Sequence, residues 1–115
     1  MESILTSIKK LVGGIAKEYT HFDDEIIAYI NSTFFVLRQL GVGPAEGFVI
    51  EDDSATWDEY IPHDPVLREA TKTYVKAKVK LQFDPPTSSA HLEALRSTIN
   101  EYEWRLNVDV ETPST

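Results

Sequence analysis

The residues of this chain that could perform chemistry are three histidines and several clusters of carboxylates. His21, His63 and His91 are far apart in the sequence and lie near expected helix starts or in loops, which favours capping or surface roles over a metal site. His63 precedes Asp64. This pair would suit a general base and its orienting carboxylate, but adjacent residues rarely orient one another and no nucleophile accompanies them. The motifs of phosphate-binding loops, serine hydrolases and zinc proteases are also absent from the sequence, so we expect no enzymatic activity and no cofactor.

The carboxylates gather in an acidic segment, residues 41–64, where seven Asp or Glu residues and no Lys or Arg give a formal charge of -7. Two clusters in it could bind a hard cation: Glu51, Asp52 and Asp53, and then Asp58 and Glu59. They lack the alternating ligands and the glycine of an EF-hand loop. A solvated acidic loop is therefore the simpler interpretation. Weak binding of a divalent ion, or an enzyme that depends on one, is the alternative.

The composition predicts one cysteine-free domain. The chain has 115 residues, enough for a core that buries about two-thirds of the unfolded surface, and 42% hydrophobic residues exclude a disordered chain. The lack of cysteine excludes disulfides, thiolate zinc sites and cysteine nucleophiles, and it fits a reducing cytoplasm. No stretch approaches the ~20 apolar residues of a membrane span. The N-terminus lacks the basic and apolar regions of a signal peptide, so we expect none.

The net charge of -8 argues against a protein that wraps nucleic acid for affinity, because phosphate contacts need clustered Lys and Arg. An acidic balance otherwise indicates little more than solubility.

Helical spacing of apolar residues predicts most of the secondary structure. We expect helices over residues 3–12, 23–40 and 66–83, and a last helix that starts at Thr87, Ser88 or Ser89 and ends near Val108. Glycine and proline provide the stops, at residues 13–14, 41–44 and 85–86. The second helix is apolar around much of its circumference, so we expect it to be the central one.

The connection between the second and third helices is long. Within it, Phe48 to Ile50 could form a short strand, and residues 55–60 could form one helical turn capped by Ser54. In the third helix, Val75 and Val79 lie beside the basic residues, which predicts that this helix contacts protein on two sides. The last helix has one apolar seam, formed by Leu92, Leu95, Ile99, Tyr102 and Leu106.

The predicted fold is therefore all-α, a small bundle of about four helices with a long acidic loop between the second and third helices and a loose C-terminal tail. We expect residues 1–108 to form the helical domain and residues 109–115 to form a flexible tail.

A basic stripe on the third helix and the acidic segment have opposite charge. Arg68, Lys72, Lys76 and Lys80 form the stripe. It could be a solvated face, could pair with the acidic segment of the same chain, or could contact the acidic segment of a neighbouring copy. Complementary patches at different places on one molecule favour head-to-tail contacts, which close into rings when the rotation allows. The predicted subunit interface comprises this stripe and Glu51, Asp52, Asp53, Asp58, Glu59 and Trp57.

The two tryptophans have two interpretations. Most tryptophans of a small domain belong to the core, but Trp104 stands off the seam of the last helix and Trp57 lies in the acidic segment. Both are therefore also candidates for interface anchors, a role in which tryptophan is enriched.

Several segments, in register over residues 1–108, resemble the head–tail connector (head-completion adaptor) family of long-tailed bacteriophages and prophages. They are Thr20-His21-Phe22-Asp23 before an Ile- and Phe-rich helix, Leu40-Gly41-Val42-Gly43-Pro44, the stretch from Phe48 to Trp57-Asp58, Phe83-Asp84-Pro85-Pro86-Thr87-Ser88-Ser89, and Glu103-Trp104-Arg105-Leu106-Asn107.

The resemblance implies an all-α structural protein of the virion, assembled in the bacterial cytoplasm and placed at the head–tail junction. Such adaptors form a ring, twelve-fold in the virion, under the portal protein. The ring extends the DNA channel without binding DNA specifically and presents a platform for the next head-completion or tail protein. Adaptors often order a C-terminal segment on the portal, which here implicates Trp104, Arg105, Asn107, Val108, Asp109 and Val110.

The alternative to an adaptor is a small helical interaction module, such as a regulator or an antitoxin-like protein, that binds one host protein. It predicts a small defined oligomer and no affinity for a portal.

Overall fold

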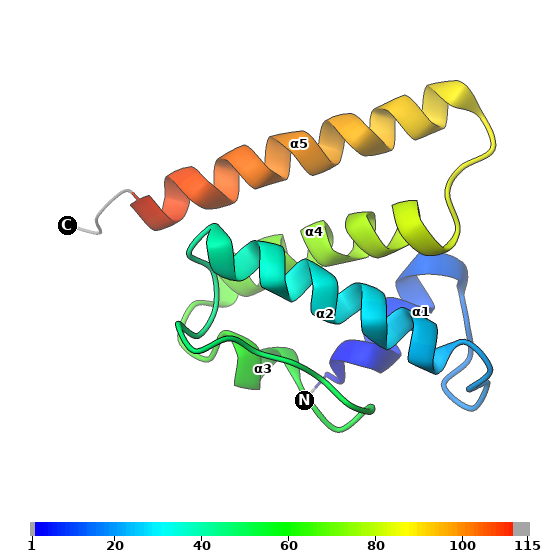
Figure 1. The fold of residues 1–115 in the computed structure, drawn as a ribbon, viewed down its shortest axis with the longest axis horizontal. Helices are drawn as coiled ribbons and strands as arrows, with labels where there is room; N and C mark the ends of the chain where they lie inside the picture. The colour runs from blue at the N-terminus through cyan, green and yellow to red at the C-terminus, as the bar shows by residue number, and fades with distance from the viewer. Residues whose placement is uncertain (1, 112–115) are drawn as a thin grey trace.

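The computed structural model of the protein describes residues 2–111, and it is all-α as predicted (Figure 1). The described part contains five helices: α1 (Ile4–Gly13), α2 (Asp23–Gln39), α3 (Trp57–Tyr60), α4 (Pro65–Phe83) and α5 (Ser89–Glu111). The bounds of α1, α2 and α4 agree with the predicted ranges to within one residue. The only β pairing among the described residues is an isolated bridge between Ser3 and Thr56.

Local sequence explains where these helices start and stop. Ser3 caps α1 by accepting a hydrogen bond from the amide of Thr6, and Gly14 ends α1 with a φ of 63°. Asp64 caps α4 in the same way, and Pro65 occupies its first turn, where the missing N–H is not needed. Ser88 Oγ accepts from the amide of His91, which identifies the cap of α5 among the three predicted candidates.

The cap of α3 differs from the prediction. Ser54 was expected to cap this turn, but Thr56 does so: its hydroxyl accepts from the amide of Glu59, and the Glu59 carboxylate accepts from the amide of Thr56. This reciprocal arrangement is a capping box. Ser54 instead donates to Asp52.

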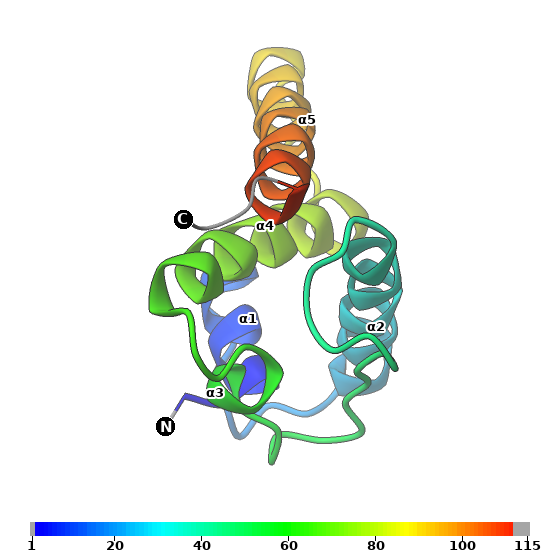
Figure 2. The same ribbon diagram turned by 90° about the vertical axis from the view of Figure 1, so that its left-hand side faces the viewer.

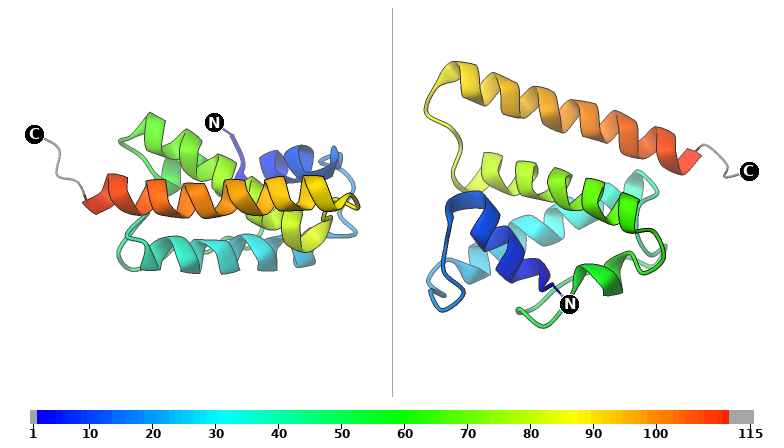
Figure 3. Two further views of the ribbon diagram at one scale, coloured as in Figure 1. Left: turned by 90° about the horizontal axis from the view of Figure 1, so that it is seen from above. Right: turned by 180° about the vertical axis from the view of Figure 1, so that it is seen from behind.

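The helix at the centre of the fold is α4, not α2 as predicted. Figure 2 shows α4 between two layers, with α5 alone on one side and α1, α2 and α3 on the other, and α4 contacts all four. Seen from above, α5 runs along α4, with α1 and α2 on either flank (Figure 3). Val75 and Val79 are fully buried along with Tyr74 and Ala77, which confirms that α4 is covered on two sides.

The expected strand at Phe48 to Ile50 does not form. No second strand lies beside it among the described residues; the side chain of Asn31 on α2 takes that place. Asn31 Nδ2 donates to the carbonyl of Ile50 at 3.0 Å, and the amide of Ile50 donates to Asn31 Oδ1 at 2.8 Å. One side-chain amide therefore satisfies both backbone groups of Ile50, which explains how Ile50 is buried without a sheet.

At the C-terminus, α5 continues through Glu111, beyond the expected end at Val108. Ile99 and Leu106 of its predicted seam are buried, and Leu95 and Tyr102 pack against the core. Burial of each large apolar side chain contributes about 1.5–3 kcal/mol, so this seam is enough to hold α5 on α4. The expected tail beyond Glu111 lies outside the described residues, and the division at residue 108 stays a prediction.

Candidate interaction surfaces

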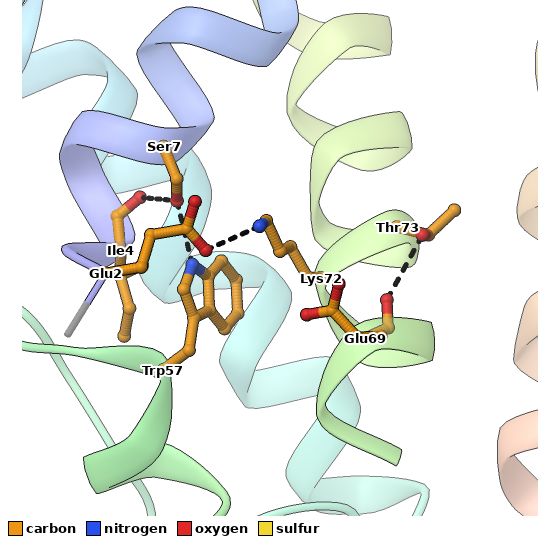
Figure 4. A network of polar contacts seen from close by, with 7 residues as sticks. All are labelled: Glu2, Ile4, Ser7, Trp57, Glu69, Lys72 and Thr73. Atoms are coloured by element: carbon orange, nitrogen blue, oxygen red, sulfur yellow. Dashed lines mark hydrogen bonds and ion pairs between the residues drawn. The ribbon is translucent and has the colours of Figure 1, made fainter. Parts of the chain in front are cut away.

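The basic stripe of α4 is largely engaged within the chain. The Arg68 guanidinium donates to the carbonyls of Ile61 and Pro62 at 2.9 and 3.3 Å, which holds the end of the acidic segment against α4. Lys72 forms an ion pair with Glu2 at the N-terminus (Figure 4). These partners are two backbone carbonyls and the Glu2 carboxylate, so Arg68 and Lys72 do not pair with the carboxylate clusters of the acidic segment.

Of the other two lysines of the stripe, one has hydrogen-bond partners within the described residues and the other has none. Lys80 Nζ donates to the carbonyl of Val12 at 3.1 Å and to Asp84 Oδ2 at 2.8 Å. It therefore binds the end of α1 to α4. Lys76 has no hydrogen bond or ion pair within the described residues, and its side chain is half-buried. Lys76 is therefore the residue of the stripe whose ammonium could pair with a second molecule.

The expected interface role of Trp57 is wrong for the folded chain, because the residue is only 1% exposed. Its indole N–H donates to the hydroxyl of Ser7 at 2.8 Å, and Ser7 donates in turn to the carbonyl of Ile4. Figure 4 shows this chain of bonds between α3 and α1. Trp57 belongs to the core, which is the other interpretation that the sequence allowed.

Three carboxylates of the acidic segment make hydrogen bonds within the chain. Asp52 accepts hydrogen bonds from the hydroxyl and the amide of Ser54, and these bonds hold the pKa of Asp52 below its usual value. Glu59 completes the capping box of α3, and Asp64 caps α4. These three carboxylates have local structural roles.

The remaining exposed carboxylates flank an exposed apolar residue in the sequence. Glu46, Glu51 and Asp53 are exposed and make no ion pair or side-chain hydrogen bond in the part of the chain that the structure describes. Val49, between them in the sequence, is 69% exposed, and Phe35 of α2 is 59% exposed. Phe35, Val49 and Glu46 border one groove of about 270 Å³. We call these five residues the Val49 patch.

The segment that carries this patch is held firmly. Arg38 Nε donates to the carbonyl of Ala45 at 2.9 Å, and Asn31 binds Ile50 as described above. Gly43 has a φ of 86°, and a Cβ atom there would lie 2.6 Å from the Tyr60 ring. The patch therefore projects from a fixed backbone.

Trp104, Arg105 and Val108 of α5, three of the residues implicated in portal docking, are exposed. Trp104 is 66% exposed and Val108 is 37% exposed, whereas Asn107 is half-buried. Arg105 forms an ion pair with Glu101 one turn earlier, with Nε 2.9 Å from Oε2. The side chains of Asp109 and Val110 lie outside the described residues. The Trp104 side chain is thus accessible to a second molecule.

One polar contact joins the inward side of α5 to α4. Tyr74 donates its phenolic hydrogen to Glu103 at 2.6 Å, and Lys78 Nζ lies 4.0 Å from the same carboxylate. Burial is the main cause that raises the pKa of Tyr74, and the carboxylate adds to it. Because the hydroxyl is a donor here, the neutral phenol is the form that the fold favours.

The described residues contain no group of three or more His, Asp or Glu side chains that could hold a metal ion. The carboxylates at 51–53 and 58–59 thus form no such site. In residues 2–111, no helix is both long and apolar enough to cross a bilayer.

The fold is all-α, and its surface carries exposed charged and apolar side chains. A comparison with protein families identifies the class of protein. A family model described as phage connector protein matches residues 4–113. The chain belongs to the phage connector protein family. No curated protein and no solved structure matches it.

Membership defines the general role. The family is one of structural proteins, so the chain is a structural connector of a phage and a component of the virion. It also implies oligomerisation and contacts with the portal and other phage proteins.

The sequence did not reveal several residues that shape these surfaces. Asn31 gave no signal, because its partner Ile50 lies nineteen positions away. Phe35 stands off the apolar stripe of its helix, which is a signal that could have marked it as a surface residue.

Proposed function

We propose that this protein is a head–tail adaptor that assembles as a ring beneath the portal, twelve-fold in the virion. The ring extends the DNA channel and offers a platform for the next head-completion or tail protein. The observation that carries this proposal is the family match, which spans residues 4–113. The net charge of -8 supports it, because a channel for DNA should not bind phosphate.

The geometry of α5 supports docking on the portal. The helix packs on α4 and leaves Trp104 on its outward face, 66% exposed. A large aromatic side chain that is exposed in the free protein and buried in a complex is the usual anchor of an interface. In the proposed assembly, Trp104 and Val108 are buried against the portal.

The test is capture by the portal protein that the same phage genome encodes. The purified portal ring is mixed with the chain, and the bound mass is measured by sedimentation and by electron microscopy. We expect a ring of bound chains with the symmetry of the portal. Trp104→Ala should weaken binding at least about tenfold, as expected for an anchor. Asn100→Ala, at an exposed position one turn earlier, should leave binding unchanged.

Failure of the portal to capture the wild-type chain at any concentration would contradict the proposal. If Trp104→Ala and Asn100→Ala weaken portal binding equally, the chain is still an adaptor, but α5 does not dock on the portal through Trp104. A stable small oligomer that binds a host protein instead would favour the regulator alternative.

A further inference from the structure

A second groove lies far from the Val49 patch, where the end of α1 meets α4 and the start of α5. It has a volume of about 370 Å³, and its apolar lining includes Leu11, Ala94 and Leu95. Lys76, Lys80 and His91 also line it, and no carboxylate does. We call these six residues the Lys76 groove.

The groove has both features needed to bind an acidic, apolar segment. Leu11 is 45% exposed, which is costly for a large aliphatic side chain in water. Lys76 has no partner within residues 2–111, whereas Lys80 is held by Val12 and Asp84. An apolar floor with an available cation at its edge favours a ligand that carries an aliphatic side chain between carboxylates.

The Val49 patch has that composition. Val49 is 69% exposed, and Glu46, Glu51 and Asp53 around it are exposed carboxylates without partners among the described residues. The backbone beneath them is fixed by Asn31 and Arg38, so little ordering entropy is lost when it binds. Charge and polarity are therefore complementary between two surfaces of the same chain.

These two surfaces lie on different parts of the fold. The groove is where α1, α4 and α5 meet, whereas the patch lies on α2 and the connection that follows it, on the side of α4 away from α5 (Figure 2). Two different complementary surfaces on one molecule make a heterologous contact, which forms a ring or an open filament.

We infer that the Val49 patch of one copy docks in the Lys76 groove of the next, with Val49 over Leu11 and Ala94 and the carboxylates beside Lys76 and His91. This contact rests on the proposed ring and specifies its subunit interface. It differs from the predicted one in that Arg68, Lys72 and Trp57 take no part, because they are engaged inside the chain.

The chain contains no cysteine, so introduced cysteines report this contact without background. The test protein carries Val49→Cys and Ala94→Cys, both at exposed positions, and is oxidised at a concentration where the wild type assembles or on the portal. We expect a ladder of covalent oligomers larger than dimers, because each chain links to two neighbours.

The matched control carries Val49→Cys and Asn100→Cys, which is on the opposite face of α5. Its ladder should be at least about tenfold weaker, since its thiols lack the high effective concentration of a contact.

A charge exchange tests the electrostatic part independently. The patch variant carries Glu46→Lys, Glu51→Lys and Asp53→Lys, and the groove variant carries Lys76→Glu and His91→Glu. Each alone should associate at least about tenfold more weakly than the wild type, because like charges then meet at every contact. An equimolar mixture should recover assembly, because every contact in an alternating ring again joins opposite charges. Circular dichroism and urea unfolding of each variant verify that it is folded.

Equal ladders for the two cysteine pairs, or a mixture that assembles no better than its components, would overturn the inference. Portal capture of the wild type distinguishes a failure of this interface from a failure of the proposed adaptor function. If the portal captures the chain and the ladder is absent, the adaptor stands and this interface is wrong. If neither is observed, both fail.

Discussion

Lys9 Nζ lies 2.8 Å from Asp23 Oδ1, although the lysine side chain is only 2% exposed. The same ammonium donates hydrogen bonds to the carbonyls of Lys17 and Tyr19 at 3.1 and 2.7 Å. One buried cation thus ties α1 to the connection that follows it and to the first residue of α2.

Replacement of this lysine should be costly. Lys9→Met keeps the aliphatic volume but leaves Asp23 and two carbonyls without their cation. We expect the free energy of unfolding to fall by about 2–4 kcal/mol, since a group that loses a buried charged partner must be desolvated without compensation. Urea unfolding measures this change. Lys10→Met, at the exposed neighbouring position, is the control and should change stability by less than about 0.5 kcal/mol. Similar effects of the two substitutions would contradict the role of the Lys9 contacts.

The two buried tyrosine hydroxyls should respond differently to removal. Tyr74→Phe removes the donor to Glu103, so we expect a loss of about 1.5–3 kcal/mol at pH 7, as for a hydrogen bond to a charged group. Tyr60 OH is buried without a hydrogen-bond partner in the described structure, so Tyr60→Phe should be neutral or stabilising. Thermal unfolding of both variants at equal pH tests the opposite signs. A large loss for Tyr60→Phe would show that its hydroxyl has a partner.

The same tyrosines predict a loss of stability at high pH. Burial raises the pKa of both above the ordinary value of 10.0, so the folded state keeps them neutral after they have ionised in the unfolded chain. Their contribution is complete below pH 10 and declines as the pH rises further. Unfolding free energies between pH 8 and 11 should therefore fall above about pH 10. Tyr74→Phe should make that decline shallower; an unchanged slope would contradict the raised pKa.

Asn31 should control the order of the Val49 patch. Asn31→Ala removes both bonds to Ile50, and we expect a loss of about 1–3 kcal/mol because two buried backbone groups are left without partners. Hydrogen exchange of the Ile50 amide should accelerate more than that of the α4 amides. Ser32→Ala, at the adjacent exposed position, is the matched control. Equal protection of Ile50 in both variants would show that other contacts hold this segment.

Gly43 and Gly14 provide a paired test of backbone strain. Both have positive φ, but a Cβ at Gly43 would clash with Tyr60, whereas at Gly14 it meets nothing within 4 Å. Gly14→Ala should cost about 1–2 kcal/mol from φ alone. Gly43→Ala should cost more, about 2–4 kcal/mol, because the Tyr60 ring must move as well. Urea unfolding compares them, and equal losses would mean that Tyr60 yields freely.

Local signals explain how much of the fold could be predicted. The stops at Gly14 and Pro85 and the caps at Ser3 and Asp64 act within a few residues, so the helix bounds could be deduced from the sequence. The position of α4 at the centre could not, because it depends on which helices pack together. The short segment at Phe48 was misassigned for a related reason: its backbone partner is a side chain on another helix.

The candidate surfaces also combine features that local sequence predicts with features that depend on contacts between distant residues. Helical periodicity placed Arg68, Lys72, Lys76 and Lys80 on one stripe, but it could not reveal that carbonyls of distant residues occupy two of them. Trp57 is bonded to Ser7, fifty positions away, which no local pattern indicates. The sequence predicts charge complementarity between α4 and the acidic segment. Fewer of the predicted residues can contact a second molecule than the sequence indicates, because Arg68, Lys72 and Lys80 have partners within the chain.

The way in which α5 is attached has a mechanical consequence. This helix runs back along α4 after the turn at residues 84–88, and its seam from Leu106 to Leu95 lies along that one neighbour (Figure 1). A pull on the C-terminus would load these contacts one after another, in a peeling mode, and not all at once. The helix could then yield turn by turn while Lys9, Trp57 and the core beneath α4 stay intact.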